Sequence, residues 1–332
     1  MRSSRRPVSL LLLAVALGLS AGCRFDAPPE SRVSYTELVQ RTFASPEDAV
    51  VALIDAAREG DVDAVRTIFG PDVEGLESDS ADRTQGDLQR LAAAYDRQHA
   101  LFLEEGTNGT PPSVTLAVGA DLWEFPVPIA RVRDGAEPLW RFDTAAGVAI
   151  VHAARIETNE AAAVDFLLAC MPAQSQYRDL APLGVSAYTT RFRSERGTRN
   201  GLWWPESLTP PVSPLGPMVD DGVARATEPV DLEALSSYRG YRYRILTAPG
   251  PAAVRNGSPD ASPWLNRNGD LVGGFAFLAW PLSYGDTGER AFLVSMDGSV
   301  WSRDFGLYAD AAIEPVTSFD PGTGWERVEF AP

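Results

Sequence analysis

The residues able to carry catalysis or bind a metal are few and widely spaced in this sequence. Only two histidines occur, His99 and His152, and neither has a Cys or Glu at the spacing of a metal site. The motifs of zinc metalloproteases and nucleotide-binding proteins do not occur, and the Gly-x-Ser-x-Gly pattern of hydrolases occurs once, at Gly18–Gly22 inside the apolar N-terminal segment, where no catalytic role is expected. The 45 acidic residues leave a hydrolase with a carboxylate pair open, but no spacing selects two of them. We therefore predict no metal and no cofactor, and our first hypothesis is a non-enzymatic protein.

The best candidate for recognition is an irregular loop, residues 194–221, that is rich in Trp and Pro. Aromatic and proline side chains stack well on sugars and peptides. The candidate binding surface consists of Trp203, Trp204, Pro205, Pro214 and Pro217. The competing interpretation is structural: both rings close the core of the C-terminal sheet, as most large apolar side chains do. Between the two rings, we expect Trp204 to be structural and Trp203 to face a partner.

Cys23 has the most specific predicted chemistry. The stretch Leu19-Ser20-Ala21-Gly22-Cys23 resembles the lipobox of bacterial lipoproteins, although Ser20 stands where that motif usually has an aliphatic residue. In that family a peptidase cuts before the cysteine, and its thiol then carries a diacylglycerol. The resemblance implies lipidation at Cys23. An ordinary cleaved signal with an incidental cysteine is the alternative.

The segment before Cys23 has the features of an export signal. Residues 1–22 combine a basic start with an apolar run over 10–19, which is too short to be a permanent membrane span. We predict a signal peptide over 1–22 and a tether over 23–44, with general secretion or twin-arginine export as the route. The expected location is the bacterial cell envelope, facing the periplasm and attached to the outer membrane where there is one.

The charge of the chain restricts its partners. The sequence has no Lys, and loss of the three arginines of residues 1–22 leaves 26 basic and 45 acidic residues, a net charge of −19. Such a protein repels nucleic acid. We therefore expect membrane attachment through the lipid on Cys23 alone, and an envelope protein or polysaccharide as partner. The second cysteine, Cys170, has no expected disulfide partner and is predicted to be a buried helix residue.

Residues 45–150 are predicted to form a small α+β domain. Ser45-Pro46 is typical of a helix start, and Gly60 is expected to end this helix. A second helix follows, and a third over 87–104 carries His99 on its apolar stripe, where a packing role is expected. Strands and a hairpin follow over 114–142. The order is similar to that of cone-shaped nuclear-transport-factor-like domains.

Residues 151–332 are predicted to form an antiparallel sheet crossed by one long helix over 159–177. Pro172 is expected to kink this helix or end its first half. The best-defined strands lie within 271–305, where Asp297-Gly298 is predicted to form a two-residue type I′ turn. The fold class is therefore α+β.

Seven segments of the chain resemble a family of exported bacterial proteins known as the domain of unknown function 2950 family, over residues 42–328. This resemblance implies no activity. The segments are Phe43–Ala49, Trp140–Gly147, Asn159-Glu160, Gly201–Pro205, Ser213–Pro217, Gly240–Ala248 and Gly273–Ala276.

A second resemblance concerns the C-terminal half. The order of Asn159–Ala163, Ala173–Tyr177, Tyr241–Tyr243 and Phe292–Val300 is similar to that of pilin and pseudopilin globular heads, in which one helix packs across an antiparallel sheet. The assembly helix of pilins is absent, so the resemblance implies an accessory role without polymerisation. We predict a lipid-anchored envelope protein that acts as a binding or assembly module.

Overall fold

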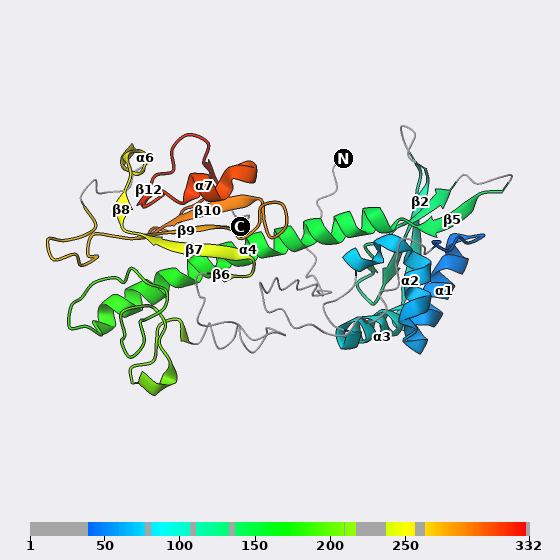
Figure 1. The fold of residues 1–332 in the computed structure, drawn as a ribbon, viewed down its shortest axis with the longest axis horizontal. Coiled ribbons are helices and arrows are strands. Elements are labelled where there is room, and N and C mark those ends of the chain that lie inside the picture. The colour runs from blue at the N-terminus through cyan, green and yellow to red at the C-terminus, as the bar shows by residue number, and fades with distance from the viewer. Residues whose placement is uncertain are drawn as a thin grey trace, which may run out of the picture. The chain divides into compact units, whose positions relative to one another are not determined.

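The computed structural model describes residues 39–76, 81–106, 111–132, 137–208, 210–216, 237–255 and 263–329. The chain forms two compact units, Met1–Ala154 (unit 1) and Arg155–Pro332 (unit 2). Helices and antiparallel sheets occur in both units, which confirms the predicted α+β class (Figure 1). The predicted signal peptide and Cys23 lie outside the described residues.

Unit 1 begins with helices that start and stop where their capping residues predict. The Ser45 hydroxyl accepts a hydrogen bond from the Asp48 N–H at 3.1 Å, and Gly60 ends the first helix in the left-handed conformation, with φ of 68°. Asp61 caps the second helix through the Ala64 N–H at 2.9 Å. The elements are α1 (Pro46–Glu59), α2 (Val62–Phe69), the 3-10 turn η2 (Pro71–Gly75) and α3 (Ala81–Arg97).

The third helix begins and ends earlier than predicted. It ends at Arg97, and His99–Glu104 forms strand β1, which pairs along its whole length with β2 (Ser113–Val118). The helical position predicted for His99 is therefore wrong, because the ladder with β2 outweighs the local helical period. The His99 ring stacks on Tyr95 with centroids 3.8 Å apart.

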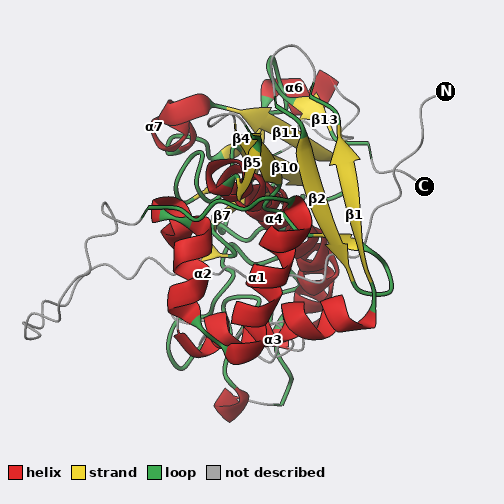
Figure 2. Cartoon of the chain, turned by 90° about the vertical axis from the view of Figure 1, so that its right-hand side faces the viewer, coloured by secondary structure: helices red, strands yellow, loops and turns green. Residues whose placement is uncertain are grey.

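The sheet of unit 1 is antiparallel, in the order β1-β2-β4-β5, with β3 also paired to β2. Figure 2 shows α1, α2 and α3 gathered beside the β1–β2 ladder. The pairing of β4 with β5 confirms the predicted hairpin, whose tip lies outside the described residues. The remaining strands are β3 (Trp123–Glu124), β4 (Ile129–Val132) and β5 (Leu139–Phe142).

A single helix of 37 residues, α4 (Thr144–Leu180), starts in unit 1 and continues into unit 2. It contains the predicted helix 159–177, but Pro172 does not end it. Proline removes one backbone donor from the helix. Here the Pro172 side chain is exposed, whereas Cys170 and Ala173 on either side of it are buried in the core of unit 2. We attribute the unbroken helix to this packing.

Unit 2 is built around a six-stranded sheet in the order β13-β11-β10-β9-β7-β6, with every neighbouring pair antiparallel. All six residues of β9 are buried. Its strands are β6 (Ser237–Tyr238), β7 (Tyr241–Leu246), β9 (Ala276–Pro281), β10 (Arg290–Ser295), β11 (Val300–Asp304) and β13 (Glu326–Arg327). The smaller elements are η3 (Glu206–Leu208), β8 (Ala248–Pro249), α6 (Pro251–Arg255), η5 (Gly306–Tyr308), α7 (Ala309–Ile313) and β12 (Ser318–Phe319).

The hairpin between β10 and β11 has a different turn from the predicted one. Gly298 has φ of 85°, but Asp297 is not among the residues with positive φ, so a type I′ turn is excluded. The Ser295 N–H donates to the Ser299 carbonyl at 3.1 Å, and the Gly298 N–H donates back to Ser295 at 3.0 Å. This is a three-residue loop with glycine at the left-handed position.

Candidate functional site

The structure places the two predicted loop tryptophans in the core of unit 2. Trp203 is 9% exposed and Trp204 is 2% exposed. The Trp204 indole N–H donates to the Pro211 carbonyl at 2.9 Å, and its ring meets Tyr177 edge-on with centroids 6.4 Å apart. Both rings therefore take the structural role, and the expectation that Trp203 faces a partner is corrected.

The prolines of the predicted binding surface have different environments. Pro205 is exposed and Pro214 is half-buried, whereas Pro217 lies outside the described residues. The two described prolines do not form an aromatic surface with the tryptophans, because the rings point into the core. A stacking surface in the form predicted from the sequence is not present at this loop.

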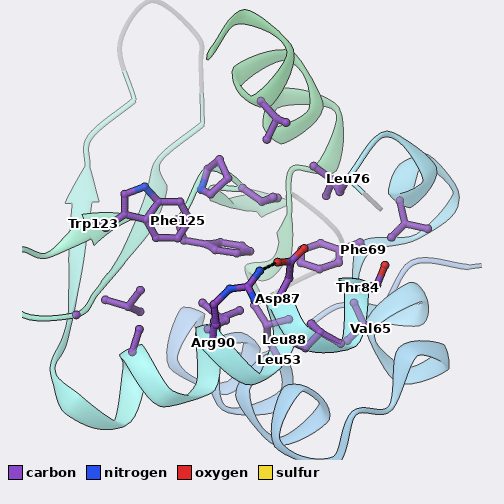
Figure 3. Close-up of a pocket in the computed structure, with 18 of the residues that line it drawn as sticks. Leu53, Val65, Phe69, Leu76, Thr84, Asp87, Leu88, Arg90, Trp123 and Phe125 are labelled. Atoms are coloured by element: carbon purple, nitrogen blue, oxygen red, sulfur yellow. Dashed lines mark hydrogen bonds and ion pairs between the residues drawn. The ribbon is translucent and has the colours of Figure 1, made fainter. Parts of the chain in front are cut away.

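Unit 1 contains an apolar cavity of about 210 Å³ that the sequence did not reveal (Figure 3). Its wall is formed by side chains of α1, α2, α3, β2 and the segment around β3, together with the first part of α4. The apolar lining residues are Leu53, Val62, Val65, Phe69, Val73, Leu76, Leu88, Leu91, Ala94, Val118, Trp123, Phe125, Pro126, Val127 and Val151.

An aromatic group of three rings lines this cavity. Phe69 and Phe125 stack with centroids 6.3 Å apart, and Trp123 meets Phe125 edge-on at 6.2 Å. Figure 3 shows Trp123 and Phe125 on one side and Asp87, Leu88 and Arg90 of α3 on the other.

Backbone geometry holds the start of β3 in place. Leu122 has φ of 51°, which is unusual for a residue that is not glycine. Its N–H donates to the Gly119 carbonyl at 3.0 Å, so a tight turn leads directly into Trp123. A conformation of this kind is often found where the surrounding structure fixes a functional group.

The start of α4 approaches the cavity wall closely because it has a glycine there. A Cβ atom added to Gly147 would lie 2.6 Å from Cγ2 of Val127, a cavity-lining residue. No side chain fits in that space. Gly147 therefore allows α4 and the segment after β3 to close one end of the cavity.

Polar side chains occur in the cavity lining as well. Asp87 and Arg90, one helical turn apart on α3, form an ion pair in which Asp87 is mostly covered and Arg90 mostly exposed. Thr84, Arg97 and Asp121 are the other polar lining side chains. Small-molecule sites commonly combine an apolar interior with a few such groups.

This arrangement is suited to binding a small apolar molecule. An apolar cavity of about 150 Å³ in a protein interior can hold benzene, so about 210 Å³ accommodates one ring with a short alkyl group. The predicted alternative, a carboxylate-pair hydrolase, would need two carboxylates facing one bond, whereas Asp87 is already paired with Arg90. No cluster of three His, Cys, Asp or Glu with metal-binding geometry occurs among the described residues.

Sequence reasoning missed this site because its residues carry no local signal. The apolar stripes of α1, α2 and α3 are the ones expected of any helix that packs on a sheet. The spacing of apolar residues along each helix does not determine how far apart the helices and the sheet lie. It therefore cannot show whether their apolar faces are in contact or leave a cavity. Leu122, whose backbone conformation is unusual, is also not identifiable from its residue type.

Comparisons with known proteins give one match. Residues 40–328 match the family described as "Protein of unknown function (DUF2950)". No curated protein and no solved structure matches the chain. The similarities to pilin heads and to nuclear-transport-factor-like domains therefore stay predictions from the sequence. Of the helices in the described part of the chain, none has the length and apolarity needed to cross a membrane.

Proposed function

This chain belongs to the DUF2950 family of proteins of unknown function, and we propose that it is a lipid-anchored protein of the bacterial cell envelope whose unit 1 binds a small apolar ligand. The proposal is for a non-enzymatic binding module. The observation that carries it is the cavity of about 210 Å³ between the helices and the sheet of unit 1. Binding would remove apolar surface of both ligand and cavity from water, which is the main driving force at such sites.

The lining indicates which ligands fit. The aromatic group of Phe69, Trp123 and Phe125 favours a flat ring, since offset and edge-on ring contacts stabilise beyond the area they bury. The ion pair of Asp87 with Arg90 places hydrogen-bonding groups within reach of a polar substituent on that ring. The favoured ligand class is therefore a small aromatic compound with a short alkyl or polar substituent.

Toluene and ethylbenzene are suitable probes, and ligand-detected NMR measures their binding. We would use mature chain 23–332 with Cys23→Ala, because acyl chains and detergent would themselves take up apolar probes. Ala94 lines the cavity, and its neighbour Ala93 is exposed on the same helix. Ala94→Leu should reduce probe binding at least about tenfold by filling the space, since tenfold corresponds to about 1.4 kcal/mol, and Ala93→Leu should not. Equal binding by both variants would contradict the cavity as the site.

The proposed location rests on the sequence before the described residues. The stretch Leu19–Cys23 resembles a lipobox, and a lipid-modified cysteine at its end would provide a membrane anchor. Cys23→Ala in the full-length precursor should release the protein from the membrane fraction and abolish labelling by a radioactive fatty acid. Full membrane retention of the unlabelled variant would disprove the anchor while leaving the ligand-binding test unaffected.

The hydrolase alternative has a separate test. Asp87→Asn and Asp121→Asn change the two carboxylates that line the cavity. A hydrolase of envelope polymers that used them would lose activity on peptidoglycan fragments in either variant. The binding module predicts no release of soluble products by the wild-type protein at all.

A further inference from the structure

A second candidate site lies in unit 2, where four arginines fall within nine residues of an otherwise acidic chain. They are Arg191, Arg193, Arg196 and Arg199. Three of them, Arg191, Arg193 and Arg196, line a cleft of about 880 Å³. This volume is within the range of small-molecule sites. The other lining residues are Ser194, Glu195, Gly197, Pro205, Ser207 and Leu208.

The backbone that carries Arg191 and Arg193 is hydrogen-bonded to the segment around Trp203, and the two segments run parallel. The Leu202 N–H donates to the Arg191 carbonyl at 3.0 Å, and the Ser194 N–H donates to the Trp203 carbonyl at 2.8 Å. A Cβ atom on Gly201 would lie 2.4 Å from the backbone carbon of Arg193, so this close approach requires glycine. The buried Trp203 is thus an anchor for the arginine-bearing strand.

Two of the arginines help to hold the site in shape. The Arg193 guanidinium lies 5.5 Å from the Trp203 ring centroid, within the range of a cation–π contact. Arg199 is not a lining residue and donates to the Leu208 carbonyl at 2.6 and 3.0 Å and to the Pro210 carbonyl at 3.0 Å. These bonds tie the two sides of the loop together.

The cleft keeps a positive charge after its internal ion pair is counted. Glu195 accepts from Arg191 at 3.0 Å and from the Asn200 amide at 3.0 Å. Three arginines and one glutamate line the cleft, so the charge of the lining is +2. Arg196 sits in a turn closed by the Thr198 N–H and the Glu195 carbonyl at 3.0 Å. Within the part of the chain that the structure describes, its guanidinium has no hydrogen-bond or ion-pair partner.

We propose that this cleft binds a sugar-sized ligand that carries a phosphate group. Planar guanidinium groups match phosphate oxygens with paired hydrogen bonds. The cleft is several times larger than the cavity of unit 1, so a phosphate ion alone would leave it mostly empty. Long polyanions are disfavoured, because the whole chain has a formal net charge of −16.

The phosphate could be part of a soluble sugar phosphate or of a lipid headgroup, and the experiment separates these sources. Isothermal titration calorimetry on the Cys23→Ala mature chain would compare glucose 6-phosphate, glucose and inorganic phosphate. Sedimentation with phosphatidic acid vesicles would test the headgroup. We expect glucose 6-phosphate to bind, inorganic phosphate to bind more weakly, and glucose not to bind. Vesicle binding alone, lost in the arginine variants below, would assign the same site to a lipid headgroup.

Arginine variants test the site itself. Arg196→Gln should weaken phosphate binding about tenfold, and the double variant Arg191→Gln/Arg196→Gln about a hundredfold, since a hydrogen bond to a charged group typically contributes enough for a tenfold change or more. Arg267→Gln is the matched control, because Arg267 is also exposed in unit 2 but does not line the cleft.

Fold integrity is checked by thermal unfolding of each variant. The Arg196 side chain has no partner among the described residues to lose, so this single variant keeps the test valid if the double variant is unstable. The proposal would be overturned if no phosphate probe binds. It would also be overturned if a probe binds wild type and both Arg196→Gln and the double variant equally well. Equal affinity for inorganic phosphate and glucose 6-phosphate would contradict the proposal that the cleft recognises the sugar as well as the phosphate.

Discussion

The two units differ in how completely their apolar side chains fill the core. In unit 2, all six residues of β9 are buried between neighbouring strands and covering elements, and Trp204 closes the core at 2% exposure. In unit 1, the helices and the sheet also bury an apolar core but leave a cavity of about 210 Å³ beside it. Unit 2 therefore uses its largest aromatics to fill space, and unit 1 uses Phe125 and Trp123 to line it.

This difference changes which sequence features indicate function. The Trp203-Trp204-Pro205 stretch is the most conspicuous aromatic motif of the chain, yet it anchors a loop. The cavity wall consists of ordinary Leu, Val and Phe at helical spacing. A conspicuous motif can thus be structural, while a binding site can be made of residues that look like core.

The largest effect is expected from removing the ring that closes unit 2. Trp204→Ala should lower the free energy of unfolding by about 3–5 kcal/mol, because it leaves a large void. It also removes the hydrogen bond to the Pro211 carbonyl. Trp123→Ala, at the half-buried cavity wall of unit 1, should cost only about 1–2 kcal/mol. Urea unfolding of both variants measures the two values, and equal losses would erase the proposed difference between the units.

Adding volume should have opposite consequences in the two units. Ala279 of β9 has no exposed surface and faces Phe292 and Tyr243 on the neighbouring strands. Ala279→Leu should therefore destabilise the protein by about 1–3 kcal/mol through overpacking. Ala94→Leu extends into existing space, so its cost should stay within about 0.5 kcal/mol. Thermal unfolding checks both, and a large cost at Ala94 would show that the cavity cannot take a ligand-sized group.

Parts of the fold could be predicted because local chemistry decides them. Ser45 and Gly60 fix both ends of α1, and the strands of the β9–β11 region are bounded by Gly, Pro and Asp. Predictions failed where the secondary structure of a segment depends on contacts with residues far away in the sequence. His99 joins a strand because β2 pairs with it, and α4 passes through Pro172 with buried residues on both sides of it.

The candidate sites were harder to predict than the fold. The cavity exists because helices and strands from different parts of the chain lie at a certain distance from one another. That distance cannot be read from the types of their residues. The arginine cluster near Arg196 was visible in the sequence, but its significance depends on the backbone hydrogen bonds that place three of its members in one cleft. Only the tryptophans and prolines of the loop 194–221 were considered from the sequence, and two of the cleft arginines, Arg191 and Arg193, lie before that loop.

A smaller effect concerns the acid sensitivity of the β10–β11 hairpin of unit 2. Burial alone would raise the pKa of Asp297, but hydrogen bonds from Ser295 and Ser299, together with nearby Arg327, outweigh it and lower the pKa below its ordinary value. A carboxyl with a lowered pKa stabilises the folded state fully above its unfolded pKa of about 3.9. That contribution is lost as the pH falls through the lower pKa of the folded state.

Asp297→Asn should therefore destabilise the protein at neutral pH by up to about 1 kcal/mol, the typical contribution of hydrogen bonds of this kind, and much less at pH 3. Urea unfolding of wild type and variant at several pH values measures the difference. Asp121→Asn, on the exposed lining of the unit 1 cavity, serves as a control that should show no such trend. A difference that grows towards low pH would contradict the assigned hydrogen bonds.

The last prediction is that ligand binding in unit 1 does not change the labelling rate of Cys170 in unit 2. It tests whether the two units open independently. Cys170 lies on α4 in the core of unit 2 with no exposed surface, and burial raises the pKa of its thiol. Because the thiolate is the reactive form, labelling by a thiol reagent requires unit 2 to open around Cys170. In the Cys23→Ala chain this is the one remaining thiol. Its labelling rate therefore reports the opening of unit 2.

A ligand at 100 times its dissociation constant stabilises the unit that binds it by about 2.7 kcal/mol. If toluene binds in unit 1 and the units open separately, it should raise the urea midpoint of unit 1 and leave the labelling rate of Cys170 unchanged. Glucose 6-phosphate, bound at the arginine cleft of unit 2, should instead slow the labelling. Slower labelling with toluene, absent in the filled variant Ala94→Leu, would show that the two units do not open independently.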